Sequence, residues 1–320
     1  MRSLRGFFMV LGVFAGVAGV LEAMNRRLEA AGTAEVSGIG ERRYYGWRGG
    51  EISYRVLGEG PPLLLVHGIY AGASSAEFER NIRGLSEDFK VYAVDLLGCG
   101  TSEKPAREYR PQDVAEQLEG FVKEVIGGTP THLVASSLSA ALALPAIVRN
   151  PRLFKKLVLI CPTGYRPLDR PSGRLGDFVY GVFRLPVVGY ALYHALASRK
   201  SIRYFLEKTA YHDPDKVTDE LVTAYYRAGH GPGSQYLPAA FASGKLNFNA
   251  AGYWPRVANR TMLVWGQQAG AASSVSQLNQ FLSHNPRTAY RIFRDTALLP
   301  HAERPETFDR EVREFLLAKA

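Results

Sequence analysis

The sequence predicts an α/β protein whose sheet is mainly parallel, and two observations support this class. Short apolar runs alternate with segments of helical pattern, and most connections between the runs are long enough for the crossover helices that parallel strands require. The chain has 320 residues, 46% of them hydrophobic and 11% aromatic, which is enough for a substantial core. We therefore expect helices on both faces of the sheet.

The first 24 residues are a separate apolar segment. Residues 6–21 carry no charged side chain, Arg2 and Arg5 precede them, and Glu22 interrupts them. This length lies between a signal-peptide core and a membrane span of ~20 residues, and no good Ala-x-Ala cleavage site follows. We expect residues 1–24 to be an uncleaved membrane anchor, with a cleaved signal segment and secretion as the alternative. The charged, glycine-containing residues 25–41 are typical of a linker.

The core begins with a predicted β-hairpin. Residues 43–47 and 52–56 form its strands, and Gly49 and Gly50 separate them. A turn at residues 58–62 leads to the first buried strand. The expected buried strands are residues 63–66, 91–94, 132–135, 157–160, 262–264 and 290–293. The core therefore falls into two parts, residues 42–162 and 257–320.

Residues 163–256 interrupt the strand pattern and are expected to form a helical insertion. Residues 166–207 contain seven basic and three acidic residues. Over the whole chain, Lys plus Arg exceed Asp plus Glu by 39 − 30 = 9. Apolar helix faces with basic flanks suit a membrane surface, while helices packed on the core with solvated arginines are the alternative. Nucleic acid is not expected as a partner, because no known binding motif accompanies the charge.

Ser137 stands at the junction between a predicted strand and a predicted helix. The turn from Ala135 to Ser139 reads Ala-Ser-Ser-Leu-Ser, so the residues two positions to either side of Ser137 are small. This stretch resembles the nucleophile elbow, usually Gly-x-Ser-x-Gly, in which a tight turn exposes the central serine. The resemblance makes Ser137 the nucleophile position, and an ordinary Ser-rich helix cap is the alternative.

Three further motifs extend this resemblance. Val-His-Gly at residues 66–68 is similar to an oxyanion loop, and residues 95–105 are similar to an Asp-x-x-Gly-x-Gly-x-Ser-x-x-Pro loop. The third is Glu-Arg-Pro at residues 303–305. Together these motifs resemble the α/β-hydrolase superfamily, in its lidded serine-hydrolase type. The resemblance implies an eight-stranded sheet, a helical lid at residues 163–256, and an oxyanion hole formed by the backbone N–H groups of Ile69 and Leu138. In such a loop His67 is expected to order the turn, with a role as substitute base as the alternative.

The resemblance also implies that the catalytic triad is incomplete. Residues 297–306 are similar to Gly-His-x-Pro-His-x-Glu-Arg-Pro-Glu, which puts Leu298 at the histidine position and makes His301 the second, non-catalytic histidine. Residues 265–270 are similar to a Trp-Gly-x-x-Asp-Pro turn, which puts Ala269 at the position of the acid. A rerouted triad of Ser137, Asp169 and His301 is the alternative, and it requires Pro300 and the following helix start to be displaced.

The expected function follows from the missing base. A serine without its base is a weak nucleophile, and loss of such a triad member typically costs ~10⁴–10⁶ in turnover. We therefore expect a membrane-associated α/β-hydrolase-fold protein that binds an apolar or acyl ligand, or a partner, without ordinary triad catalysis. Membrane lipid would be contacted through residues 6–24 and through the lid. The alternative is an ester-type serine hydrolase with a non-standard base or the rerouted triad, or a cofactor-free reaction that uses the oxyanion hole.

No cofactor or metal is expected. The histidines and the two cysteines have no metal-ligand spacing. Cys99 and Cys161 are expected to be free thiols, because the family's strand order keeps the ends of their strands too far apart for a disulfide.

Overall fold

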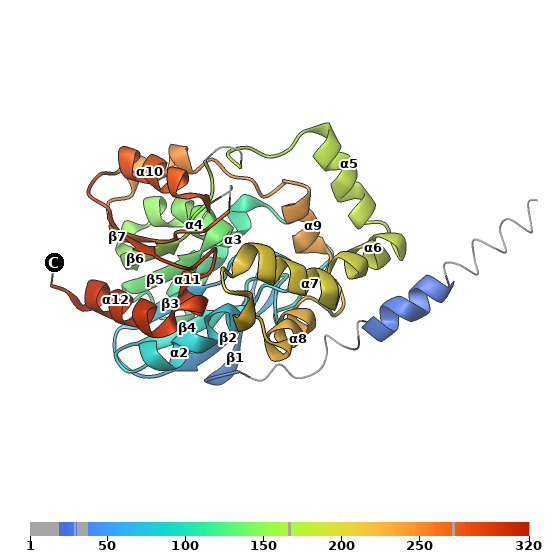
Figure 1. Cartoon of the computed structure of the whole chain (residues 1–320), viewed down its shortest axis with the longest axis horizontal. Helices are drawn as coiled ribbons and strands as arrows, with labels where there is room; N and C mark the ends of the chain where they lie inside the picture. Colours follow the sequence, from blue (N-terminus) through green and yellow to red (C-terminus); the bar gives the residue numbers. More distant parts are fainter. Residues whose placement is uncertain (1–18, 29, 31–37, 166–167, 271–272, 320) are drawn as a thin grey trace, which may run out of the picture.

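The computed structural model describes residues 19–28, 30, 38–165, 168–270 and 273–319. Its centre is an eight-stranded sheet with the order β1-β2-β4-β3-β5-β6-β7-β8 (Figure 1). The strands are β1 Glu41–Trp47, β2 Gly50–Leu57, β3 Pro62–Val66, β4 Lys90–Val94, β5 Thr131–Ser136, β6 Phe154–Ile160, β7 Arg260–Gly266 and β8 Ala289–Phe293. Every predicted strand is present.

The sheet is parallel from β4 to β8, and only β2 pairs antiparallel with its neighbours β1 and β4. Its central strands are fully buried: Leu63, Leu64 and Val66 of β3 expose none of their surface. Buried apolar strands of this kind require cover on both faces. The predicted fold class, an α/β-hydrolase fold with a mainly parallel eight-stranded sheet, is confirmed.

Helices flank the sheet in two packed groups. Helix α2 contacts α12 and α11, whereas α3 contacts α4. Their bounds are α2 Glu79–Leu85, α3 Pro111–Gly120, α4 Ser137–Arg149, α10 Val275–His284, α11 Pro300–Glu303 and α12 Pro305–Leu317. The short turns η1 Ser75–Phe78, η2 Phe121–Val125 and η3 Pro151–Leu153 complete this part of the chain.

A long helical segment connects β6 to β7. It contains α5 Arg174–Phe183, α6 Val188–Leu196, α7 Arg199–Phe205, η4 Leu206–Ala210, η5 Pro214–Lys216, α8 Asp219–Ala228, α9 Tyr236–Ala242, η6 Ala250–Gly252 and η7 Trp254–Arg256. Figure 1 shows α5 to α9 gathered beyond one end of the sheet. Side-chain caps fix two of its helices: Ser198 accepts from Ser201 N, and Thr218 accepts from Leu221 N. The use of this segment as a lid stays a prediction.

The N-terminal helix, residues 19–28, lies on the same side of the molecule (Figure 1). Its Asn25 is 2% exposed and donates a hydrogen bond from Nδ2 to the carbonyl of Val187, just before α6, at 3.1 Å. Residues 1–18 of the predicted anchor, and residues 29 and 31–37 of the predicted linker, lie outside the described residues. Within the described part of the chain, no one helix has the length and apolar composition to cross a membrane; α5 and α6, bent by 99°, meet those criteria only as a pair.

Both cysteines are buried and free. Cys99 lies in the loop after β4 and Cys161 directly after β6, and strands β3 and β5 lie between these two strands. Burial raises the pKa of the Cys161 thiol to about 12, and it also raises the pKa of Cys99. Neither thiol is therefore a ready nucleophile.

Candidate functional site

Ser137 lies at a sharp turn between β5 and α4. Ser136 is the extended N-cap residue, and Ser137 begins the helix with φ +53°. A non-glycine residue in this region of φ is uncommon and strained, and it persists where the surroundings fix it. The flanking Ala135 and Ser139 are completely buried. Small residues are needed there, and the turn presents the Ser137 side chain to a cavity at the carboxyl end of the sheet.

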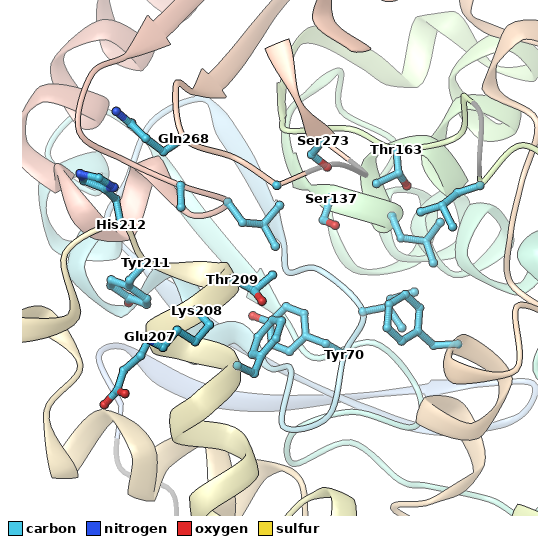
Figure 2. A pocket seen from close by; sticks show the side chains of 18 of the residues that line it. Tyr70, Ser137, Thr163, Glu207, Lys208, Thr209, Tyr211, His212, Gln268 and Ser273 are labelled. Carbon is cyan, nitrogen blue, oxygen red and sulfur yellow. The ribbon is translucent and has the colours of Figure 1, made fainter. Parts of the chain in front are cut away.

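This cavity has a volume of about 580 Å³. It lies within the range of ~300–1,000 Å³ that is typical of small-molecule sites. In Figure 2, Ser137, Thr163 and Ser273 enter it from the sheet, Tyr70 enters from the loop after β3, and the residues of η4 enter from the connection between β6 and β7. The apolar part of the wall comes from Leu138, Leu168, Phe205, Phe241 and Leu298.

The predicted oxyanion-hole residues, Ile69 and Leu138, both line this cavity. Within the described residues, the backbone N–H of neither one donates a hydrogen bond to another residue. Leu138 is the second residue of α4, where the helix dipole favours negative charge. These two N–H groups are thus open to a carbonyl or carboxylate oxygen of a ligand, and their role in an oxyanion hole stays a prediction.

His67 is engaged in structural hydrogen bonds. Its Nε2 accepts from the backbone N–H of Leu96 at 3.0 Å, so Nδ1 carries the proton and donates to the carbonyl of Gly68 at 2.6 Å. The ring is completely buried. Because both nitrogens are occupied, the geometry favours the expected role of His67 in ordering the loop over the alternative role as a base.

Leu298 and Ser137 line the same cavity. The Leu298 loop is held firmly by its neighbours: Ala297 N–H donates to Glu303 Oε1 at 2.6 Å, and Leu299 N–H donates to the carbonyl of Ala210 at 3.1 Å. Leu298 itself is half-buried. A leucine side chain thus stands where the family resemblance predicts the catalytic base.

Ala269, at the predicted acid position, follows β7 and is 9% exposed. The neighbouring Gln268 lines the cavity instead, and it binds the loop before Leu298 through two hydrogen bonds with Thr296. Its N–H donates to Thr296 O at 3.0 Å, and its Oε1 accepts from Thr296 N at 3.1 Å. Among the lining residues, the carboxylate of Glu207 is 3.3 Å from Arg203 and belongs to that ion pair.

The structure does not bring Ser137, Asp169 and His301 together. His301 is completely buried, its Nε2 lies 3.2 Å from Glu77 Oε1, and its ring stacks on Phe78 at 4.7 Å between centroids. Asp169 lies 3.7 Å from Arg170. His301 is not among the residues that line the cavity. The rerouted triad would have to pull His301 out of the core and away from the buried carboxylate of Glu77.

The comparison with known proteins identifies the family. A model of the alpha/beta hydrolase family matches residues 63–311. The chain belongs to the α/β-hydrolase family. It is 32% identical over 123 residues to 2-hydroxy-6-oxo-6-(2'-aminophenyl)hexa-2,4-dienoic acid hydrolase from Metapseudomonas resinovorans, covering 38% of this chain and 42% of the relative. The chain spans about two fifths of the length of the first curated relatives that it matches.

Two broader matches agree with this membership. The chain is 30% identical over 218 residues to the magnesium-chelatase 30 kDa subunit of Rhodobacter capsulatus, covering 65% of this chain and 70% of that subunit. Among solved structures, a membrane phospholipase A described as a bacterial virulence factor superposes with a TM-score of 0.68 at 22% identity, over 98% of this chain and 97% of the other. At that identity the likeness is one of fold.

Sequence reasoning missed two residues at the site of this α/β-hydrolase-family chain: Gln268, described above, and Glu77, which is 3% exposed. Its Oε2 accepts from the Gly68 N–H at 3.0 Å and from the Tyr70 hydroxyl at 2.5 Å, and its Oε1 faces His301. Burial acts to raise the pKa of Glu77, but His301 and the Tyr70 hydroxyl outweigh it, and the pKa lies below its usual value. Glu77 thus connects the loop after β3 to the helix that follows Leu298. Its sequence context resembles an ordinary helix start, which gives no signal for such a contact.

Proposed function

We propose that this member of the α/β-hydrolase family binds an apolar or acyl ligand in the Ser137 cavity without ordinary triad catalysis. The observation that supports this proposal is that Ser137 and Leu298 line one cavity while His301 is paired with the buried Glu77. A hydroxyl without a proton acceptor is a poor nucleophile near neutral pH. Ligand binding does not need a proton acceptor for Ser137. It needs the cavity, which Ile69 and Leu138 line together with Ser137.

The composition of the wall supports an acyl ligand. Apolar side chains make up much of the cavity, and polar groups converge near Ser137, where Thr163 and Ser273 also line the wall. A carbonyl or carboxylate oxygen beside Ser137 would accept from the N–H groups of Ile69 and Leu138. The remaining hydrocarbon would then lie against Leu298 and Phe205.

We further propose that the protein is membrane-associated through residues 6–24. The support is the uncharged run at residues 6–21 and the exposure of large apolar side chains on the same side of the molecule as the N-terminal helix. Leu175 and Phe178 of α5 are 78% and 69% exposed. A structural neighbour is named as a membrane phospholipase A. Secretion after cleavage of the N-terminal segment remains the alternative proposal.

The second candidate function is ester-type hydrolysis with a non-standard base. It is favoured by the strained turn at Ser137, with φ +53°, and by the hydrolase names of several relatives. His212 also lines the cavity, at the far side from Ser137 in Figure 2. A base supplied from η4 or the residues after it would need a movement of this segment toward Ser137.

A labelling experiment separates the two functions. Full-length protein in phosphatidylcholine vesicles is treated with a fluorophosphonate probe and with short-chain nitrophenyl esters, and Ser137→Ala is the control. We expect labelling and ester turnover of the wild type to match those of Ser137→Ala. We also expect a fatty acid with a diazirine near its carboxylate to crosslink to residues of the Ser137 cavity. Rapid, stoichiometric fluorophosphonate labelling of Ser137 would exclude the first proposal, ligand binding without ordinary triad catalysis.

A further inference from the structure

A second cavity, of about 220 Å³, adjoins the Ser137 cavity. Three aromatic side chains, Tyr70, Phe205 and Phe241, line both spaces. The rest of its wall comes from Ala71 in the loop after β3, from the end of α5 and from α6, α7 and α9, including Leu196, Ile202 and Ala239. The two cavities therefore share an aromatic partition and lie one behind the other beneath the helices that connect β6 to β7.

The partition has a buried, hydrogen-bonded side and a more exposed side. Tyr70 is held by its hydroxyl on Glu77 at 2.5 Å, and its ring stacks on Tyr225 at 5.9 Å and contacts Phe205 at 5.2 Å. Phe241, in contrast, is 36% exposed. An exposed aromatic side chain changes rotamer readily, whereas a buried stacked ring does not. Phe241 is thus the side of the partition that can open.

Among the described residues that line the second cavity, each polar side chain already has a hydrogen-bond partner. The Tyr193 hydroxyl donates to the carbonyl of Gly229 at 2.6 Å, and the Ser201 hydroxyl lies 3.0 Å from that of Ser198. The Tyr70 hydroxyl is bound to Glu77. The other described wall residues are apolar. A polar group entering this space would lose its hydration without replacement, so only a hydrocarbon gains by entering it.

The far end of the second cavity reaches an apolar surface. Leu196 lines the cavity and is also 53% exposed. Its own helix continues that surface with Val188 and Leu192, which are 52% and 40% exposed. An apolar path therefore leads from the surface of α6, past Ile202 and Ala239, to the aromatic partition and then to Ser137.

We propose that the second cavity holds the hydrocarbon chain of a single-chain amphiphile whose carboxylate or ester group lies beside Ser137. This inference rests on the proposed binding function and adds the place of the chain. The polar groups converge at one end of the path and are absent from the other, which sets the orientation of the ligand. The chain passes Phe241 and points toward Leu196.

Two photoreactive fatty acids of the same length test the placement. One carries its diazirine near the carboxylate and the other at the end of the chain, and both are added to full-length protein in phosphatidylcholine vesicles. We expect the first to crosslink to the Ser137 cavity and the second to α7 and α9, around Ile202 and Ala239, by peptide mass spectrometry. If the first probe labels the Ser137 cavity and the second does not label this region, the tail site is wrong but ligand binding stands. If neither probe labels either cavity, both proposals fail.

Two substitutions in the wall of the second cavity give a further test of where the hydrocarbon chain lies. Ala239→Trp fills the second cavity, and Ala242→Trp narrows it from an exposed position that tolerates a large side chain. Each should weaken binding of a long-chain fatty acid by about fourfold for every methylene that no longer enters, while binding of a short-chain acid is unchanged. Ala195→Trp, exposed on α6 and not part of the wall, is the matched control. Equal chain-length dependence in Ala242→Trp and the wild type would overturn the tail site, even if Ala239→Trp fails to fold.

Discussion

In the proposed site, a leucine at position 298 removes the proton acceptor of the Ser137 hydroxyl without changing how the surrounding backbone is held. The hydrogen bonds that fix this loop come from the N–H groups of Ala297 and Leu299, and neither depends on the side chain at position 298. The sharp turn at Ser137 is also present. Ile69 and Leu138, whose N–H groups are the predicted oxyanion donors, line the same cavity. In the proposed site, the missing parts are thus a proton acceptor and the acid that orients it.

We predict that the double substitution Ala269→Asp and Leu298→His creates or greatly raises esterase activity, while either change alone does little. Triad residues act as a unit: a base without its acid lacks orientation, and an acid without a base has nothing to orient. The polar groups should cost ~1–3 kcal/mol of unfolding free energy, because Ala269 is nearly buried and Leu298 half-buried. Nitrophenyl ester turnover and fluorophosphonate labelling measure the gain.

The triple variant with Ser137→Ala is the control for this gain, and it should return to background. A folded double variant that stays inert toward both reagents would show that the turn or the oxyanion donors are also disabled.

The sequence predicts roles for Ser137, Ala269 and Leu298 because each stands in a motif whose register is set by its neighbours. The structure places Ser137 and Leu298 against one cavity, and the three roles stay predictions. The sequence did not identify Glu77 or Gln268. Their roles depend on contacts with His301 and Thr296, which lie far away in the chain and are brought close only by the fold. A buried carboxylate with a distant partner leaves no local pattern.

Glu77→Gln should lower stability by about 3 kcal/mol near neutral pH, since a neutral amide replaces the buried carboxylate that accepts from the Gly68 N–H and the Tyr70 hydroxyl. The folded-state pKa of Glu77 lies below 4.5, so its ionic contribution is present above that pH and is lost as the pH falls through the lowered pKa. Denaturant unfolding of both proteins between neutral and acidic pH should therefore show a difference that shrinks in acid. Glu59→Gln, at an exposed position, is the control. A difference that stays constant with pH would contradict the ionic role.

At the scale of elements, the strand pattern was predictable and its ends were not. β6 begins at Phe154, earlier than its apolar run, because it contains Lys155 and Lys156. Lys156 is 6% exposed, and its Nζ donates to the carbonyls of Phe315 and Leu316 at 2.9 and 3.1 Å, at the end of α12. A lysine that caps a distant helix terminus sits inside this strand, so the apolar run at residues 157–160 alone did not show where the strand begins.

Glu303 joins two elements that both line the Ser137 cavity. Its carboxylate is 2% exposed and accepts from the N–H groups of Ala297, His212 and Asp213 at 2.6, 2.8 and 3.2 Å. Glu303→Ala leaves these donors unpaired, and we expect a loss of about 3 kcal/mol or more in unfolding free energy. Hydrogen exchange should rise at residues 210–213 and 297–299. Glu306→Ala, exposed on α12, should change neither quantity. Unaltered exchange in Glu303→Ala would refute this connecting role.

For the whole molecule, the parallel sheet explains why residues so distant in sequence form one cavity. The loops after β3, β5, β7 and β8 supply Ile69, Ser137, Gln268 and Leu298 in turn, and the carboxyl ends of parallel strands lie at one edge. The alternation of strands and helices in the sequence predicted the parallel sheet, and therefore this common edge. It did not predict the second cavity, whose walls depend on the packing of α5, α6, α7 and α9, where no family motif fixes the geometry.

We predict that attachment of the protein to membranes depends on residues 1–24. Deleting residues 1–24 should release the protein from lipid vesicles and leave cooperative unfolding unchanged, because the deleted segment precedes every core strand and Asn25, which binds Val187, is retained. Vesicle cosedimentation and thermal unfolding measure the two effects. Loss of cooperativity would mean that residues 1–24 belong to the core.

Residual binding of the truncated protein that weakens with salt would identify the basic segment of residues 166–207 as a second contact. In that case Leu175→Glu with Phe178→Glu should abolish the residual binding, since these side chains are the most exposed large apolar residues on α5. Both lie in solvent, so the pair should change stability by less than about 0.5 kcal/mol. Residual binding that survives both the salt and the glutamates would place the second contact elsewhere on a chain whose net charge is +9.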